Sequence, residues 1–247
     1  MLSSSPSSST ATKRVPKDTQ IKLEAFANKL ADAAGNVIKP YYRLKSLDVI
    51  SKLDKSPVTI ADQKAEQAMV ALINAEFPDH VVLGEEFGSS QLVSESGEVP
   101  EFQWVLDPID GTKAFVTGKA TFGTLIALLH NGRPVLGVID QVVTKERWVG
   151  KVWDPESMGT FLNGERVHAD SLLLRSTDVA LKDCFMYTTT PEMFIAGSSD
   201  EAKYKTLAKQ VRNPLYGADC YAYALLSSGY VQLVVEADLK PWDYCAL

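Results

Sequence analysis

The chain has 247 residues, of which 45% are hydrophobic and 23% charged, enough for a globular protein with a substantial core. No apolar run is long enough to span a membrane, and a net charge of −6 without a basic stripe argues against nucleic acid as a partner. The three cysteines, Cys184, Cys220 and Cys245, show no Cys-x-x-Cys pairing, so neither a disulfide framework nor a zinc site is expected.

Residues 1–17 are predicted to form a disordered tail, and residues 18–247 the folded domain. The first fourteen residues are rich in serine and threonine, contain no acidic residue and end on Lys13-Arg14. This composition is typical of a plastid transit peptide or its remnant, with a cloning tail as the alternative. We therefore expect a soluble protein of the chloroplast stroma.

Two amphipathic helices are predicted near the N-terminus. Apolar residues recur at three- and four-residue spacing over residues 18–43 and, after a β-prone run at 47–53, again over residues 61–77. Asp62 falls in the first turn of the second helix. One interpretation of Asp62 is helix capping, because the helix dipole favours a carboxylate there.

The segment 103–113 is an apolar run that breaks into two carboxylates, a glycine and a hydroxyl. We predict a short buried strand over residues 103–106, which Pro108 ends, and a tight turn at Gly111. The alternative is an acidic turn in solvent. However, the full pattern Asp-Pro-x-Asp-Gly-Thr should arise by chance only about once in several thousand chains of this size.

Asp107 and Asp110 would converge on one point, where their charges repel unless cations neutralise them. The amides of Gly111 and Thr112, at the start of a helix, would form an anion site beside these carboxylates. Together, a cation site and an anion site predict chemistry on a phosphate ester.

The middle of the chain is predicted to be antiparallel sheet. Asn131-Gly132 and Asn163-Gly164 each separate two β-prone runs, which is the strongest short hairpin signal. Further along, residues 184–188 are predicted as a strand, and residues 199–211 and 219–228 as helices. The antiparallel sheet expected in the middle of the chain argues against a doubly wound parallel fold.

Two other apolar runs also end in acids, at Glu85-Glu86 and shortly before Asp243. Three motifs, Gly84-Glu85-Glu86, Asp107-Pro108-Ile109-Asp110-Gly111-Thr112 and Pro241-Trp242-Asp243, resemble in order and spacing the signatures of the inositol monophosphatase superfamily of magnesium-dependent, lithium-sensitive phosphatases. The likeness runs from about Asp18 to Leu247. Asp-Gly-Thr-Lys-Ala-Phe at 110–115 and the run at 122–129 most resemble the plant-type histidinol-phosphate phosphatases.

The resemblance implies an α/β (α+β) fold, a layered α-β-α-β-α sandwich of the sugar-phosphatase type with a largely antiparallel sheet. It also implies a homodimer. It assigns metal binding to Glu85, Asp107, Asp110, Asp243 and the carbonyl of Ile109, and places Glu86 close to the metals. Four carboxylates and no soft ligand select Mg²⁺ or Mn²⁺, in two or three copies, over Zn²⁺.

The resemblance further implies that Asp62 accepts a hydrogen bond from Thr112 and activates the attacking water. The amides of Gly111 and Thr112 would hold phosphate oxygens. We expect direct hydrolysis; an aspartyl-phosphate intermediate is the competing route.

Asp219 and Glu236 are the candidate substrate-binding residues. Glu236 occupies the family position that contacts the alcohol part of the substrate, and Asp219 stands where the inositol enzymes have a small neutral residue. Two carboxylates would suit a cationic alcohol such as histidinol. The alternatives are helix capping for Asp219 and a solvated strand end for Glu236.

The sequence therefore predicts a Mg²⁺-dependent phosphatase that acts on a small phosphorylated alcohol, histidinol phosphate. An inositol monophosphatase or a 3′-phosphoadenosine nucleotidase is the alternative of the same fold. Family members continue beyond the position of Leu247 by several strands and helices. A shortened, metal-binding but inactive protein is therefore the alternative of another class.

Overall fold

The computed structural model describes residues 14–45, 49–51, 57–89, 99–153, 155–168 and 179–247. Most of the predicted tail and most of the β-prone run at 47–53 lie outside these ranges. Within the described part, Val15 is buried and its carbonyl oxygen accepts a hydrogen bond from the side chain of Gln20.

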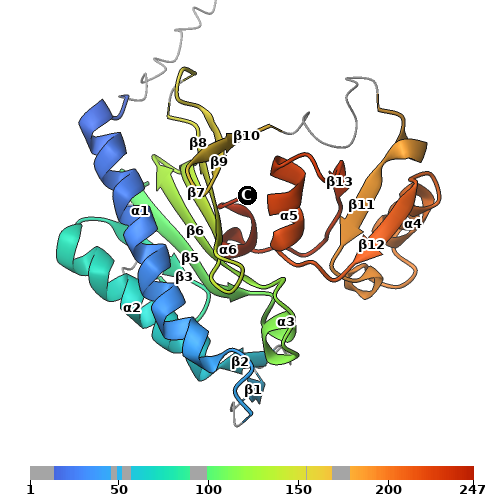
Figure 1. The fold of residues 1–247 in the computed structure, drawn as a ribbon, viewed down its shortest axis with the longest axis horizontal. Helices are drawn as coiled ribbons and strands as arrows, with labels where there is room; N and C mark the ends of the chain where they lie inside the picture. Colours follow the sequence, from blue (N-terminus) through green and yellow to red (C-terminus); the bar gives the residue numbers. More distant parts are fainter. Residues whose placement is uncertain (1–13, 46–48, 52–56, 90–98, 154, 169–178) are drawn as a thin grey trace, which may run out of the picture.

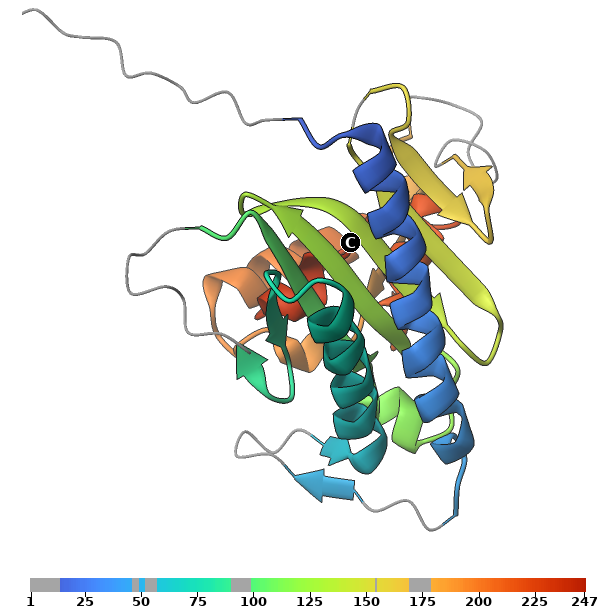
Figure 2. The ribbon, with the colours of Figure 1, turned by 90° about the vertical axis from the view of Figure 1, so that its left-hand side faces the viewer.

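The two predicted N-terminal helices are α1 (Lys17–Ile38) and α2 (Ile60–Glu76). They lie side by side on one face of the main sheet (Figures 1 and 2). Their apolar stripes, which include Leu23, Leu30 and Met69, are fully buried against that sheet. A 3-10 turn at Lys39–Tyr41 ends the first helix. Helical periodicity in the sequence thus located both helices. No helix among the described residues is long and apolar enough to cross a membrane.

The main sheet has eight strands in the order β10-β9-β8-β7-β6-β5-β3-β4, and all its pairs except β3 with β5 are antiparallel. Both predicted Asn-Gly hairpins are present, with positive φ at Asn131 and at Asn163. The strands are β3 (Val81–Gly84), β4 (Gly88–Ser89), β5 (Phe102–Asp110), β6 (Gly123–His130), β7 (Arg133–Gln141), β8 (Glu146–Lys151), β9 (Gly159–Leu162) and β10 (Glu165–Val167).

One prediction about β5 is wrong. Pro108 does not end the strand, which continues to Asp110. The register shifts between Asp107, opposite Leu125, and Asp110, opposite Gly123, so β5 carries an extra residue there. Because a bulged residue does not need a ladder N–H, proline is tolerated at this position. The bulge bends the chain and aims both aspartates at the end of the sheet.

The C-terminal part forms a second, smaller sheet of three parallel strands in the order β12-β11-β13, an arrangement that the sequence did not predict. The helices and strands of this C-terminal part are β11 (Phe185–Thr188), α4 (Ser199–Ala208), β12 (Asn213–Tyr216), α5 (Tyr221–Ser227), β13 (Leu233–Val234) and α6 (Pro241–Tyr244). It has a core of its own, which includes Met186, Phe194 and Tyr204.

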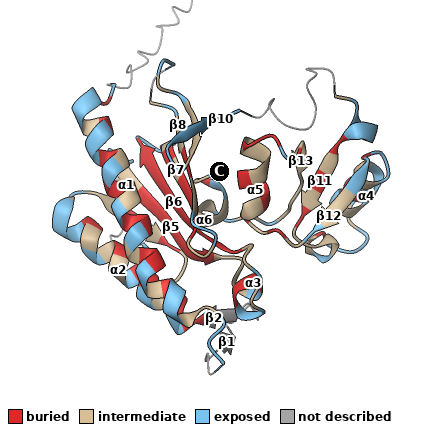
Figure 3. Ribbon diagram, in the orientation of Figure 1, coloured by how far each residue is buried: buried red, intermediate tan, exposed pale blue. Residues whose placement is uncertain are grey.

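The layers follow one another across the molecule in Figure 1: α1 and α2, the main sheet, α5 and α6, the small sheet, and α4. Figure 3 shows that the buried residues concentrate in the strands of the main sheet and on the faces of α1 and α2 toward it. This is the predicted α-β-α-β-α sandwich. A two-stranded β1 (Val49–Ser51) and β2 (Pro57–Thr59) ribbon and α3 (Thr112–Val116) complete it at one end.

Candidate active site

Three carboxylates meet where the main sheet faces α6. Asp107 and Asp110 come from the β5 bulge and Asp243 from α6, and one oxygen of each lies within 4.8 Å of the others. Asp107 is 2% exposed, and its Oδ1 is buried without a hydrogen-bond partner. Since buried acceptors are normally satisfied, this orphaned oxygen in an acidic cluster fits a cation ligand.

The raised pKa values of the clustered carboxylates also indicate a cation site. Burial, and secondarily the charges of Glu85 and Asp110, raise the pKa of Asp107 well above its usual value. Burial and the charge of Asp219 raise the pKa of Asp110 to about 7, against the hydrogen bond that its Oδ2 accepts from the Cys220 amide at 2.6 Å. The ionised carboxylates therefore need a positive charge at this point.

Glu85 and Glu86 follow β3, which pairs with β5. Glu85 lies beside the cluster, because both its charge and a side-chain hydrogen bond act on Asp107, whereas the charge of Glu86 acts on Asp62. The donors are all carboxylate oxygens, which fits Mg²⁺ or Mn²⁺. The fifth predicted ligand, the carbonyl of Ile109, accepts the Thr112 hydroxyl at 3.2 Å.

Gly111 turns the chain from β5 into α3 with φ of +80°, as the sequence predicted. A Cβ atom at this position would lie 2.7 Å from Cγ of Asp219, so glycine is required by the backbone conformation and by the close approach of a side chain. Gly111 thus lies against the side chain of Asp219, one residue after Asp110 of the carboxylate cluster.

Asp62 and Thr112 are not paired in this structure. The buried carboxylate of Asp62 instead accepts two hydrogen bonds from Thr59, one from its amide at 2.9 Å and one from its hydroxyl at 2.5 Å. The capping interpretation of Asp62 is therefore confirmed. Burial raises the pKa of Asp62 to about 6, although the Thr59 bonds oppose the shift.

Residues 20–247 match the family model described as "Inositol monophosphatase family". The chain belongs to the inositol monophosphatase family.

Two curated relatives illustrate its place in the family. It is 49% identical over 233 residues to the "Bifunctional phosphatase IMPL2, chloroplastic" of Arabidopsis thaliana, covering 93% of this chain but 62% of that protein. It is 32% identical over 231 residues to the histidinol-phosphatase of Chlorobaculum parvum, covering 93% and 80%. Among solved structures, an inositol monophosphatase from Zymomonas mobilis superposes with a TM-score of 0.74 at 41% identity, covering 92% and 80%.

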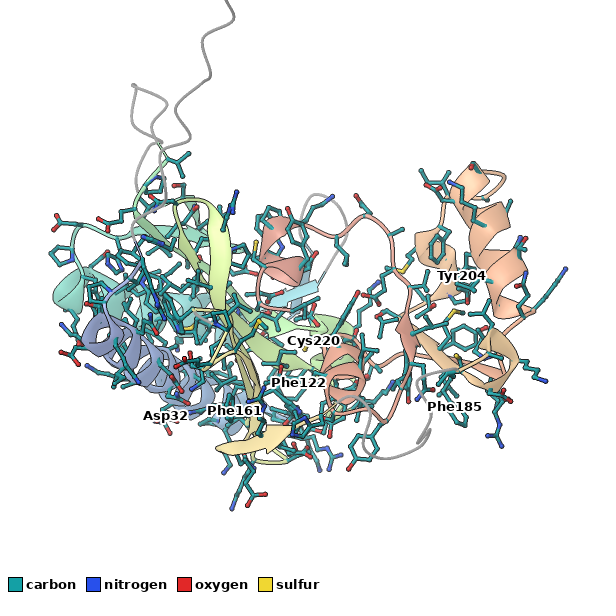
Figure 4. All side chains as sticks on the ribbon, turned by 90° about the horizontal axis from the view of Figure 1, so that it is seen from above. Asp32, Phe122, Phe161, Phe185, Tyr204 and Cys220 are labelled. Carbon is teal, nitrogen blue, oxygen red and sulfur yellow. The ribbon has the colours of Figure 1, made fainter. Side chains whose placement is uncertain are left out.

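Beside the carboxylate cluster of this family member lies a cavity of about 150 Å³. No lysine or arginine is among its described lining residues. They are Asp110, Thr189, Met193, Asp219, Cys220, Tyr223, Glu236, Leu239 and Asp243. Figure 4 shows Cys220 near the centre of the molecule, between the main sheet and the small sheet. The cavity wall therefore combines four carboxylates with side chains that carry no positive charge.

Both candidate substrate residues line this cavity. Asp219 does not cap α5, because that helix has no side-chain cap; its carboxylate accepts the Thr121 hydroxyl at 3.3 Å. Glu236 is not a solvated strand end. It accepts the Thr189 amide and the Tyr223 hydroxyl, each at 3.0 Å. The interpretation of Asp219 as a helix cap and that of Glu236 as a solvated strand end are therefore wrong. Both residues lie in the cavity wall.

Two residues near the site were missed by the sequence analysis. Tyr223 bonds Glu236 from α5, and Glu66 reaches from α2 to the backbone after Glu85. The spacing of Asp62 and Glu66, four residues apart, could have indicated Glu66, because both then lie on one helix face. No comparable sequence signal existed for Tyr223, whose partner is thirteen residues away in a loop.

Proposed function

We propose that this chain is a divalent-metal-dependent phosphomonoesterase that hydrolyses histidinol phosphate to histidinol and phosphate. The observation that carries the proposal is the cluster of Asp107, Asp110 and Asp243 beside a cavity walled by Asp219 and Glu236. The cluster supplies a place for cations, and the cavity a place for the alcohol part of a substrate.

The metals would be two or three Mg²⁺ ions, with Mn²⁺ as a substitute, held by Glu85, Asp107, Asp110, Asp243 and the carbonyl of Ile109. Such ions, when bound, lower the pKa of water and offset the charge of a phosphoryl group and its leaving oxygen. Two observations support this assignment. The buried carboxylates of Asp107 and Asp110 have raised pKa values, and Oδ1 of Asp107 has no hydrogen-bond partner.

The chain's own residues would bind and orient the phosphate and move the proton. The amides of Gly111 and Thr112, at the start of α3, would donate to phosphate oxygens. Asp62 would accept a proton from water through Thr112, with Glu86 nearby. A pKa of about 6 places Asp62 in the range of a general base near neutral pH. This role requires the Thr112 hydroxyl to turn from Ile109 toward Asp62.

Hydrolysis is proposed to be direct, with no phosphoenzyme, because Asp107 and Asp110 are assigned to the metals. In this scheme, ¹⁸O from solvent appears in the released phosphate without a trapped intermediate. Recovery of an acid-stable phosphoprotein would support the aspartyl-phosphate route instead.

The choice of substrate rests on charge. Histidinol carries an ammonium group and an imidazole, and inositol carries neither, so the carboxylates of Asp219 and Glu236 favour histidinol. A charge-assisted bond of this kind contributes about 1.5 to 3 kcal/mol. The names of relatives support the proposal, since one is a histidinol-phosphatase.

Inositol 1-phosphate remains the second candidate substrate, favoured by the 41% identity to the inositol monophosphatase from Zymomonas mobilis. A chloroplast location and a homodimer are also proposed. The first draws support from residues 1–14 and the word "chloroplastic" in the name of the Arabidopsis relative, and the second from the family resemblance.

The test is phosphate release from histidinol phosphate by the purified chain with Mg²⁺ and with EDTA, beside the matched variant Asp107→Asn. We expect hydrolysis with Mg²⁺, and loss of it both with the chelator and in the variant. Hydrolysis that persists in EDTA would remove the metals from the mechanism. A chain that binds Mn²⁺ but releases no phosphate from any ester would overturn the proposed activity.

A further inference from the structure

Glu66 is a buried acid that the proposed chemistry does not use. It lies on α2 one turn after Asp62 and is 1% exposed. Within the part of the chain that the structure describes, it forms no ion pair with a lysine or arginine, and both carboxylate oxygens accept main-chain amides. Oε2 accepts the amide of Glu86 at 2.9 Å, and Oε1 accepts that of Phe87 at 3.0 Å.

These bonds fix the backbone of the segment that carries Glu85 and Glu86. The amide of Glu85 donates to the carbonyl oxygen of Leu106 on β5 at 3.1 Å. The amides of Glu86 and Phe87 then turn to the other side, toward α2. Three successive amides are thus held, and the side chain of Glu85 within this segment contacts that of Asp107.

The side chain of Phe87 does not hold this turn, because it is 53% exposed. Gly88 follows with φ of +71°, and the chain reverses into β4. The position before Glu85 is also adapted to Glu66. A Cβ atom on Gly84 would lie 2.0 Å from Oε1 of Glu66, so only glycine lets the carboxylate sit against the end of β3.

We infer that Glu66 is a positioning residue for the metal site: it holds the Glu85–Glu86 segment so that Glu85 faces Asp107. The inference rests on the proposed function only in taking Glu85 as a metal ligand. A carboxylate is suited to this task, because ionised acceptors make short, strong bonds to two adjacent amides. A third negative charge beside Glu85 and Glu86 is electrostatically unfavourable. If Glu66 only filled space, a neutral side chain of the same size would avoid this repulsion, so we expect its carboxylate to have a specific role.

The test is Mn²⁺ binding, followed by electron paramagnetic resonance of the free ion, to the wild type, Glu66→Gln and Glu76→Gln. Glutamine keeps the volume of Glu66 but replaces one acceptor with a donor, so one of the two amide bonds is lost. Glu76 is the matched control. It lies on the same helix and makes an exposed ion pair with Lys29 at 3.0 Å.

We expect the dissociation constant for Mn²⁺ to rise about 10- to 100-fold in Glu66→Gln, as for other residues that orient metal ligands, and to stay within about twofold in Glu76→Gln. Circular dichroism at the temperature of the titration verifies that all three chains are folded. Unchanged Mn²⁺ affinity in folded Glu66→Gln would overturn the inference. If the wild type itself binds no Mn²⁺, the proposed function fails rather than the role of Glu66.

A second measurement needs no variant. Hydrogen exchange of the wild-type amides, read by nuclear magnetic resonance, should show Glu86 and Phe87 strongly protected although the Phe87 side chain is exposed. Exchange of these two amides at the rate of an unstructured peptide would also overturn the inference, whatever the stability of the variants.

Discussion

The carboxylate of Asp62 is bonded to a structural partner, Thr59, although the family resemblance assigns it a partner in catalysis, Thr112. The two roles are compatible, because a carboxylate has more acceptor positions than the two Thr59 bonds require. Its raised pKa reflects burial rather than a lack of hydrogen bonds. The residue therefore combines helix capping with the proton affinity expected of a base.

Asp62→Asn should lower kcat about 10²- to 10⁴-fold, because it removes the proton acceptor but keeps the size of the side chain. Mn²⁺ affinity should change little, since Asp62 is not among the proposed metal ligands. Steady-state kinetics with a parallel Mn²⁺ titration separates the two effects. An unchanged kcat would exclude Asp62 from the mechanism.

Tyr223 holds Glu236 in the cavity wall through one hydroxyl, so Tyr223→Phe should loosen that carboxylate. For a cationic substrate we expect kcat/KM to fall about 2- to 10-fold, the range of one hydrogen bond. Tyr221→Phe is the control, because its hydroxyl bonds Glu146 outside the cavity. Equal losses in the two variants would assign the effect to general packing of α5.

At the scale of elements, most helices and strands followed from local pattern. The apolar periodicity of α1 and α2 and the Asn-Gly turns depend only on neighbours in sequence. The extension of β5 through Pro108 does not, since a bulge is defined by the register against Leu125 and Gly123 on β6. The parallel pairing of β11 with β12 and β13 likewise depends on segments distant in the chain.

The convergence of Asp107 and Asp110 could be predicted from their spacing across a turn, and the addition of Asp243, which lies in α6, from the family resemblance. The Thr59 partner of Asp62 is also local, because it lies three residues earlier in the helix cap that the sequence predicted. The Tyr223 partner of Glu236 could not be predicted, since the two residues are thirteen apart, one in α5 and the other in a loop.

Gly111→Ala should damage the junction of β5 and α3. A left-handed φ costs an alanine about 1 to 3 kcal/mol, and the added Cβ would also displace Asp219. We expect lower stability and a marked fall in kcat/KM. Gly164→Ala, with φ of +87° and open space around its Cβ, should lose stability alone. Thermal melts and steady-state kinetics check both variants, and full activity of Gly111→Ala would contradict the close approach.

At the scale of the whole molecule, the two parts of the chain meet at the site. The main sheet contributes Asp107 and Asp110, and the C-terminal part contributes Asp219, Glu236 and Asp243. The meeting of these carboxylates makes the stability of the metal-free protein dependent on pH. The folded state raises the pKa of Asp110 to about 7 and that of Asp62 to about 6, above the value of about 4 in an unfolded chain.

Because the folded state binds these protons more tightly than the unfolded chain, their contribution to stability is present below pH 4 and is lost as the pH rises through about 7. The loss should be on the order of a few kcal/mol. Urea unfolding in EDTA should therefore give a free energy of unfolding that falls over this range. Saturating Mg²⁺ should reverse the fall, and Asp110→Asn should reduce it. A metal-free protein that is equally stable at pH 4 and pH 7 would contradict the account.

We propose that this family member uses its carboxylate-walled cavity to select a cationic phosphate ester. The most direct test is the ratio of kcat/KM for histidinol phosphate to that for inositol 1-phosphate, measured with Mg²⁺ for the wild type and for Asp219→Asn. We predict a ratio well above one in the wild type, reduced about 10-fold or more in the variant. A wild-type ratio below one, or a ratio that Asp219→Asn leaves unchanged, would contradict the claim.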